Sequence, residues 1–304
     1  MSEIATAMDL ILKTRELADA LQALRLPSGC THAYNPLTYM RAAHEAWLDL
    51  FTEEVETGEY DGREPISEMR AMPRPYLIVG MNPGPWGMVQ TGVPFGDVPN
   101  AKRILAIGEA RHMRFAPAPF AAHDKRPVYG FACTRVEQSG DRLWGGLADI
   151  WCETRDPMHL CTSPDERLCD VVTDCFALNY CPLAWFAADG TNVTPEMLAP
   201  KTREGKPNPY HDPGLLAQLD LVVAPYLLQV MNAMRTRVVL AVGKYAERKT
   251  TAIVSTLPPS ARPKVVYLQH PSPLATRSAN EWTTKARDAM VTAGVMPHQM
   301  RGGR

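Results

Sequence analysis

The stretch YLIVGMNPGPWGMVQTGVPFGD, residues 76–97, combines the two features from which the fold can be predicted. It opens with the continuous apolar run Tyr76–Gly80, which is typical of a parallel strand buried on both faces. A loop rich in glycine and proline follows at once, and in open parallel sheets ligands bind beyond the carboxyl ends of the strands. The stretch therefore predicts a buried strand that leads into a stiff loop whose backbone a ligand can approach closely.

Further apolar runs and helical patterns alternate along the chain. Predicted strands lie at residues 175–178, 238–242 and 265–268, and helical spacing covers residues 10–24, 40–51, 101–110, 143–152, 215–234, 245–257 and 281–293. Residues 56–75, 154–167 and 200–214 are predicted loops. This alternation predicts an α/β fold of three layers, α/β/α, with a mostly parallel central sheet. We expect one domain over residues 1–304, with N-terminal helices in residues 5–55 packed on it.

The charge balance excludes a generally basic protein. The 304 residues include 32 Lys and Arg against 33 Asp and Glu, so any contact with nucleic acid must be local. The most apolar stretch, residues 221–234, is interrupted by Pro225, Gln229 and Asn232 and is too short to span a bilayer. Because residues 1–12 have neither a cationic start nor a cleavage site, we expect an intracellular protein without membrane contact, in a bacterial cytoplasm or a eukaryotic nucleus.

Neither the cysteines nor the glycines match a known cofactor motif. The seven cysteines are an odd number without a C-x-x-C pair, and the five between residues 152 and 181 fit neither zinc nor iron–sulfur spacing. The glycines of residues 80–96 satisfy neither the dinucleotide nor the P-loop pattern. We therefore expect reduced thiols, no metal and no cofactor.

Polar and aromatic side chains gather where the predicted strands end. Asn82 and Phe95 lie in the loop after the first strand, Asn179 follows the second, and His270 follows the last. Because the carboxyl ends of parallel strands meet at one edge of a sheet, these side chains are expected to converge there. An aromatic face, two amides and an imidazole suit a small planar ligand that carries few charges.

These motifs resemble those of the single-strand-selective monofunctional uracil-DNA glycosylases, within the uracil-DNA glycosylase superfamily. Residues 80–96 look like the first motif of that family almost without a break, and residues 270–273 look like its second. Lesser matches lie at residues 34–37, 126–128, 139–145, 179–183 and 242–244, so the resemblance extends over about residues 30–290. It implies a uracil-DNA glycosylase fold and a hydrolase of base-excision repair that acts on damaged DNA.

The resemblance also implies a role for each motif residue. The target base is flipped into a pocket, where Phe95 would stack on it and Met81 would give a backbone contact. The amide of Asn179 would read the edge of uracil and reject cytosine, which reverses that pattern. His270 would donate to O2 as negative charge builds on the leaving base, and Asn82 would position the attacking water. No lysine lies in the two main motifs, which argues against a Schiff-base lyase.

Two positions bear on substrate range. Superfamily members that reject thymine carry a bulky aromatic where this chain has Gly84, so we expect open space at C5 and acceptance of 5-substituted uracils such as 5-hydroxymethyluracil. Leu274 stands where relatives in this family carry arginine, and an apolar side chain there would act as a wedge in the vacated base stack. This departure leaves the choice between single- and double-stranded substrate open.

The remaining DNA contacts are expected around the second motif and one helix start, at Gly243, Lys244, Ser272, Pro273, Leu274 and Arg277. The expected partner is DNA that contains uracil or an oxidised pyrimidine, and the expected state is a monomer.

Structural interpretations stand beside these functional ones. Phe95 and His270 are residue types that often serve the core, Asn82 and Asn179 suit turns and strand ends, and Lys244 suits a solvated helix face. Asp97 precedes a helical pattern and is expected to cap it rather than act as a base. Two other functions remain open at this point: the same fold acting on a deaminated purine, and a damage-binding protein that binds uracil-containing DNA without releasing the base.

Overall fold

The computed structural model describes residues 9–57, 66–106, 115–153, 164–200, 205 and 207–297. At its centre lies a sheet of four parallel strands in the order β5-β4-β8-β9. The strands are β4 (Tyr76–Gly80), β5 (Cys175–Asn179), β8 (Val238–Val242) and β9 (Lys264–Leu268). The four strands predicted from apolar runs are confirmed, as is the α/β class.

Burial follows the apolar pattern strand by strand. Every residue of β4, β5 and β8 is buried, which explains why these segments have continuous apolar runs rather than alternation. In β9, the edge strand, only Val266 and Leu268 are buried. The register pairs Gly80 with Asn179 and Val242 with Leu268, so the strands end level with one another at the carboxyl edge.

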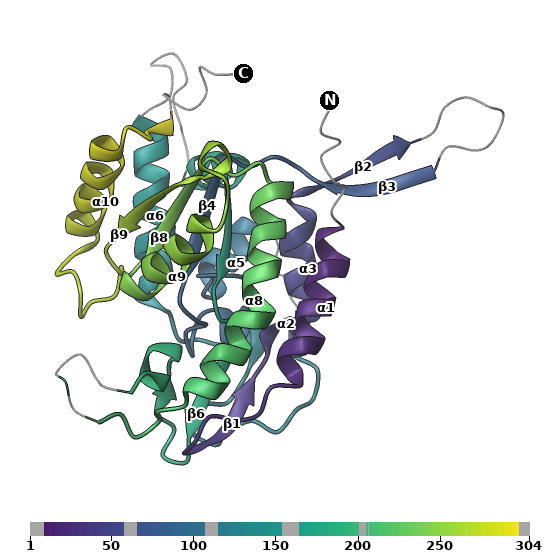
Figure 1. The fold of residues 1–304 in the computed structure, drawn as a ribbon, viewed down its shortest axis with the longest axis vertical. Helices are drawn as coiled ribbons and strands as arrows, with labels where there is room; N and C mark the ends of the chain where they lie inside the picture. Colours follow the sequence, from purple (N-terminus) through teal and green to yellow (C-terminus); the bar gives the residue numbers. More distant parts are fainter. Residues whose placement is uncertain are drawn as a thin grey trace.

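Helices cover both faces of this sheet (Figure 1). Helices α8 (Pro213–Ala233) and α9 (Lys244–Ser255) lie on one face, and α6 (Gln138–Glu153), α7 (Pro164–Asp174) and α10 (Ala279–Ala293) lie on the other. Right-handed crossovers require this division, because the chain moves outward from β4 in opposite directions on its way to β5 and to β9. The three-layer arrangement is therefore the one expected.

Two helical segments precede the sheet, as predicted, and the first of them packs on α8. Helix α1 (Leu10–Gln22) lies along α8, and the second segment is divided at Met40 into α2 (Pro36–Tyr39) and α3 (Arg41–Asp49). Within the described residues α8 alone is long and apolar enough to cross a membrane. In this fold one face of α8 is buried, and its outward residues include Leu221, which is 76% exposed.

Several elements were not predicted. Residues 56–75 were expected to be a loop, but β2 (Thr52–Thr57) and β3 (Ile66–Ala71) form an antiparallel hairpin. A second sheet joins β1 (Cys30–Tyr34), β6 (Ala184–Ala187) and β7 (Asn192–Val193). Helix α7 also begins at Pro164, within the stretch 154–167 that was expected to be a loop.

The remaining elements are short. Helix α4 (Met88–Thr91) lies inside the glycine- and proline-rich loop, and α5 (Val98–Ile104) follows it; residues 107–110 of the helix predicted there lie outside the described residues. Single 3-10 turns are η2 (Gly130–Ala132), η3 (Pro195–Leu198) and η4 (Pro259–Ala261). The predicted cap at Asp97 is confirmed, because its Oδ1 accepts from the backbone N–H of Asn100 at 3.1 Å.

Candidate active site

The carboxyl ends of β4 and β5 are joined beyond the last strand residues. The N–H of Tyr180 donates to the carbonyl of Gly80 at 2.9 Å, and the N–H of Cys181 donates to the carbonyl of Met81 at 2.9 Å. The chain segments that lead to Asn82 and away from Asn179 are therefore held side by side. Met81 itself is half-buried and packs on the core.

Phe95 and Asn179 meet at Gly80. A Cβ at position 80 would collide with Oδ1 of Asn179 and would lie 2.5 Å from Cζ of Phe95, so only glycine leaves room for both side chains. Asn179 is buried, and its Nδ2 donates to Sδ of Met88 at 3.2 Å, which directs Oδ1 toward Gly80 and Phe95. The structure thus brings together the predicted stacking ring and the predicted base-reading amide.

The backbone at Phe95 is unusual for a residue with a side chain. Its φ of 54° lies in the left-handed region, a conformation that costs about 1–3 kcal/mol and persists where surrounding contacts enforce it. Those contacts come from both sides: Oγ1 of Thr91 donates to the carbonyl of Gly96 at 2.6 Å, and Gly140 at the start of α6 lies directly against the carbonyl of Phe95. The backbone of Phe95 is therefore held in this conformation at the sheet edge.

His270 lies beyond the end of β9, against the end of β8. Its Nδ1 accepts from the backbone N–H of Ser272 at 3.2 Å, so in the neutral imidazole the proton is on Nε2. The ring packs on Gly243, whose φ of 88° suits only glycine, and the Gly243 N–H donates to the carbonyl of Leu268 at 2.8 Å. This arrangement presents Nε2–H of His270 as a hydrogen-bond donor.

Asn82 is half-buried two residues beyond β4, and its Nδ2 donates to the adjacent carbonyl of Pro83 at 3.3 Å. Since an amide is no strong base, its side chain suits orientation of a water molecule better than proton abstraction.

The space at Gly84 is not open, contrary to expectation. The carboxyl group of Glu137, one residue before α6, stands where a Cβ on Gly84 would be, and its Oε2 also lies 2.7 Å from the Cβ position of Gly87. Sequence reasoning missed Glu137, because no motif or spacing singles it out. Burial raises the pKa of Glu137 to about 7. The backbone N–H groups of Trp86 and Gly87 oppose this rise, because they stabilise the charged carboxylate. Its Oε2 is buried without a hydrogen-bond partner.

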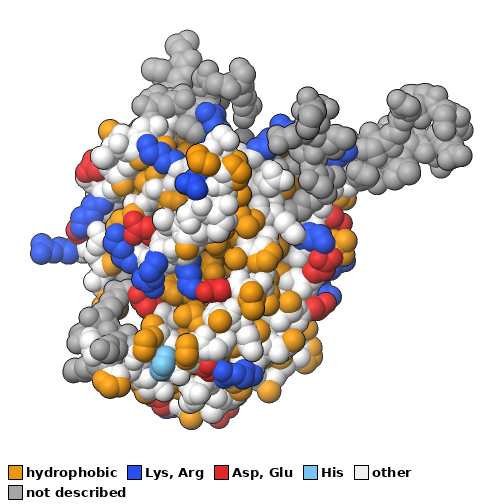
Figure 2. Space-filling view, viewed as in Figure 1, with side chains coloured by type: hydrophobic (Ala, Val, Ile, Leu, Met, Phe, Trp, Pro, Cys, Tyr) orange, Lys and Arg blue, Asp and Glu red, His pale blue; other side chains and the backbone are white. Residues whose placement is uncertain are grey.

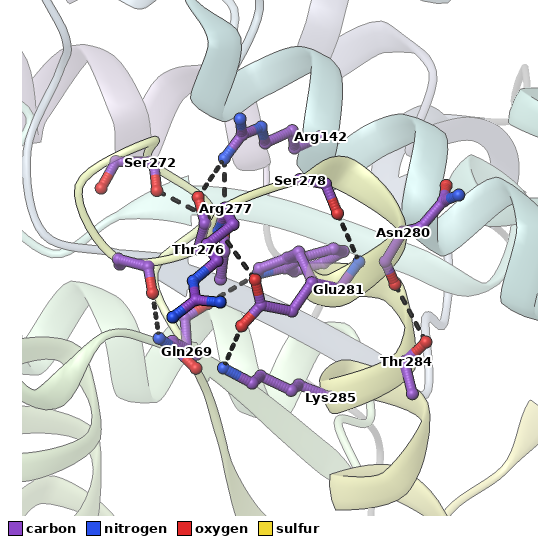
Figure 3. A network of polar contacts seen from close by, with 12 residues as sticks. Arg142, Gln269, Ser272, Thr276, Arg277, Ser278, Asn280, Glu281, Thr284 and Lys285 are labelled. Atoms are coloured by element: carbon purple, nitrogen blue, oxygen red, sulfur yellow. Dashed lines mark hydrogen bonds and ion pairs between the residues drawn. The ribbon is translucent and has the colours of Figure 1, made fainter.

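The loop between β9 and α10 carries the predicted wedge. Leu274 is fully exposed, and the loop beneath it is braced by Arg142 of α6, another residue that sequence reasoning missed (Figure 3). One guanidinium nitrogen of Arg142, Nη1, donates to the carbonyl of Thr276 at 2.9 Å, to its Oγ1 at 3.0 Å and to the carbonyl of Pro271 at 3.3 Å. Across the loop, Nε2 of Gln269 donates to the carbonyl of Ala275 at 2.5 Å.

The other predicted DNA contacts differ in their surroundings. Pro273 and Arg277 are exposed beside Leu274, whereas Ser272 is half-buried. Lys244 makes an ion pair with Glu247 at 2.8 Å, and its ammonium group lies 3.8 Å from the centre of the Tyr267 ring, as expected of a solvated helix face. Lysine and arginine side chains gather on the side of the molecule that carries α9, α10 and the loop between β9 and α10 (Figure 2).

Within the described ranges, no three or more His, Cys, Asp or Glu side chains form a group that would hold a metal ion. Cys175 and Cys181 are buried, and burial raises the pKa of Cys181 to about 12. The side chains of Cys161 and Cys169 lie outside the described part of the chain.

Known proteins resemble this chain over most of its length. Residues 71–291 match the model of the uracil DNA glycosylase superfamily. The chain is 30% identical over 277 residues to the single-strand selective monofunctional uracil-DNA glycosylase of Rattus norvegicus, covering 91% of this chain and 81% of the relative. It is 30% identical over 281 residues to the Bos taurus protein of the same name, covering 92% and 84%.

The crystal structure of wild-type Pedobacter heparinus SMUG2 has the same fold, with a TM-score of 0.51 at 16% identity, and the match covers 93% of this chain and 98% of that one. Sequence and fold therefore agree, and the chain belongs to the single-strand selective monofunctional uracil-DNA glycosylases of the uracil-DNA glycosylase superfamily.

Proposed function

We propose that this protein is a monofunctional glycosylase of base-excision repair that hydrolyses the N-glycosidic bond of uracil in DNA and leaves an abasic site. The observation that carries the proposal is the meeting of Phe95 and Asn179 at Gly80, on the edge where Asn82 and His270 also lie. An aromatic face beside a buried amide suits a flipped base that is stacked on one side and read along its edge.

Uracil fits this pair better than cytosine. With the base on the ring of Phe95, Oδ1 of Asn179 accepts from N3–H, and Nδ2 donates to O4. Cytosine has an acceptor at N3 and a donor at N4, so both contacts would be mismatched. A buried polar group that is left unpaired costs about 1–3 kcal/mol, which gives the pocket its preference.

Bond cleavage depends on stabilising the departing base. The electron pair of the C1′–N1 bond passes to the pyrimidine, and Nε2–H of His270 donates to O2 as the negative charge grows there. Water, held by Asn82, adds to C1′ of the sugar and loses a proton to solvent. Because the site offers no strong base at Asn82, stabilisation of the leaving group contributes most of the rate.

The space at C5 is polar rather than empty. Glu137 fills the room beside Gly84, so a substituent at C5 meets a carboxyl group and not an apolar wall. A hydroxymethyl group offers that carboxyl a hydrogen bond, whereas the methyl group of thymine offers none. We therefore extend the proposed substrates to 5-hydroxymethyluracil and exclude thymine.

DNA is held around this pocket by the exposed loop that carries Leu274 and Arg277. Leu274 enters the stack that the flipped base has left, and Arg277 contacts phosphate. Gly243 and Lys244 lie beside His270 at the start of α9, where backbone N–H groups suit a phosphate. The protein acts as a monomer on single-stranded or double-stranded DNA.

Base release from a labelled single-stranded oligonucleotide with one uracil, in the presence of a metal chelator, tests the proposal. Wild type is compared with Asn82→Ala and His270→Ala, and with the exposed control variants Asn280→Ala and His211→Ala. We expect alkali-labile sites with wild type and both controls, and a loss of about 100- to 1000-fold in His270→Ala, as is typical when a donor to a developing anion is removed.

Binding without base release, on single and double strands alike, would contradict the proposal and favour a damage-binding protein. Release of a deaminated purine in place of uracil would favour the same fold with a different base.

A further inference from the structure

We propose that a groove beside the base pocket binds the unpaired nucleotide next to the flipped uracil; this inference rests on the proposed function. The groove, here called the Tyr129 groove, is a hollow of about 670 Å³. It is lined by Trp86 from the first motif and by side chains between Asp124 and Arg135.

The groove is continuous with the loop after β4, which carries Asn82 and Phe95. Trp86 lies two residues after Gly84, and the buried side chain of Gln90 ties this loop to the groove wall. Nε2 of Gln90 donates to the carbonyls of Pro85 at 2.9 Å and Pro127 at 3.0 Å, and its Oε1 accepts from the N–H of Tyr129 at 2.9 Å. A nucleotide in the groove would therefore be held at a fixed place relative to the pocket.

Tyr129 supplies the surface on which a base can stack. Its side chain is 57% exposed, although a tyrosine ring buries well in a protein core. Base stacking on an aromatic ring is worth about 1–3 kcal/mol per base and tolerates any sequence, because every base has a π-face. An exposed ring in a concave surface next to a base pocket suits this use.

The charges at the groove suit a phosphate backbone. Arg135 lies over the Trp86 ring, with its guanidinium carbon 4.1 Å from the ring centre, which fixes a cation on the groove wall. Lys125 is also exposed and helps to lower the pKa of Asp189, but within the described part of the chain neither cation forms an ion pair. Asp124 is the carboxylate among the lining residues, so the cations outnumber it two to one. Such a local excess matters because the whole chain carries a charge of -1.

An unpaired neighbour is the occupant that fits this surface. Within a duplex, both faces of a neighbouring base are stacked and its edge is paired, so the base cannot lie on Tyr129 without further melting of the helix. In a single strand the same base is free to turn. The groove would therefore increase affinity for single-stranded substrate.

The test combines variants with substrates that lack one neighbouring base. Single-stranded oligonucleotides carry one uracil, with an abasic spacer at the 5′ neighbour, at the 3′ neighbour, or at neither. Tyr129→Ala is expected to raise KM for the intact strand by about 5- to 100-fold, with kcat within about twofold, whereas Tyr129→Phe stays close to wild type. Arg135→Ala is also expected to raise KM. Lys13→Ala on α1 removes a surface charge elsewhere and is the matched control.

One spacer position should raise the KM of wild type as much as Tyr129→Ala raises it on the intact strand. The spacer and the variant together should raise KM no more than either alone. That position also identifies which neighbour occupies the groove. Equal losses on duplex and single strand, or fully additive losses, would overturn the proposal. Failure of the proposed function has a different signature, namely spacer-sensitive binding by wild type without release of uracil.

Discussion

The carboxyl group of Glu137 occupies the place that a side chain at Gly84 would take. Gly84 therefore leaves room for an acidic group from a distant part of the chain. The contact joins the loop after β4 to the start of α6. In the proposed function, the space beside C5 of the base would take its shape and polarity from both residues together.

A methyl group at position 84 should displace this carboxyl. Gly84→Ala adds one carbon to a filled site, and overpacking of this kind typically costs about 1–3 kcal/mol in the free energy of unfolding. Because the loop also carries Asn82, uracil release should fall by about tenfold or more. Urea unfolding and single-turnover base release measure the two effects.

Two further variants separate collision from a general effect of alanine. Gly145→Ala lies in α6 with nothing within 4 Å of its added carbon, so its stability should be unchanged or raised by up to about 1 kcal/mol. In a protein that already carries Glu137→Ala, adding Gly84→Ala should hardly lower the free energy of unfolding, since the colliding group is gone. Strictly additive losses in the double variant would show that the two residues do not share this space.

The raised pKa of Glu137 predicts a pH-dependent stability. From the ordinary value of 4.5 up to about 7, the folded protein keeps a proton that the unfolded chain has lost. This contribution to stability is complete below pH 4.5 and is lost as the pH rises to about 7. The free energy of unfolding of wild type should therefore fall relative to Glu137→Gln across this window, by less than about 3 kcal/mol because part of the residue is exposed.

Unfolding in urea at pH 5, 6, 7 and 8 provides the comparison. Asp97, whose pKa burial also raises, is present in both proteins, so the difference between them reports the charge at position 137 together with its interaction with Asp97. Parallel curves for the two proteins would mean that Glu137 carries the same charge folded and unfolded.

Gly80 should be as sensitive as any catalytic residue although it contributes no functional group. In Gly80→Ala the new carbon would collide with Asn179 and Phe95, so base recognition should be lost, with uracil release reduced by about 100-fold or more. Gly214→Ala, whose added carbon would have its nearest neighbours at 3.8 and 3.9 Å, is the matched control. Release at the rate of wild type by Gly80→Ala would show that the two side chains are not held at this position during catalysis.

The sequence was sufficient to predict the central sheet and the residues at its carboxyl edge. Strands such as β4 and β8 are buried on both faces, so their apolar character is unbroken, and parallel order places Asn82, Asn179 and His270 at one edge whatever the details. The family motifs lie on those same strand ends.

Other features depend on tertiary contacts that leave no local pattern. Strand β2 contains three glutamates in six residues and is paired only because β3 lies opposite it. Glu137 and Arg142 have ordinary polar neighbours in sequence, and their importance follows from the approach of α6 to two distant loops. The expectation of open space at Gly84 was wrong for this reason.

The braced loop between β9 and α10 predicts that cleavage of duplex substrates depends on Leu274 more than cleavage of single strands does. Leu274 is fully exposed on a loop that Arg142 holds through two carbonyls, so the backbone that carries this side chain is fixed (Figure 3). A wedge that fills the vacated stack matters in a duplex, whereas a single strand has no partner strand to hold open. Leu274→Ala should therefore reduce kcat/KM for a duplex with uracil by about tenfold or more, with a smaller loss on single strands.

Arg142→Ala should have the same substrate dependence, because it loosens the loop without touching Leu274. Each lost bond to a charged donor costs about 1.5–3 kcal/mol, so some loss of thermal stability is expected as well. Arg287→Ala is the matched control, since Arg287 lies on α10 and binds Glu153 at the end of α6, away from the loop. The ratio of kcat/KM on duplex to that on single strands is the measurement. A ratio unchanged in both Leu274→Ala and Arg142→Ala would mean that this loop does not serve strand separation, and that another surface must hold the flipped state.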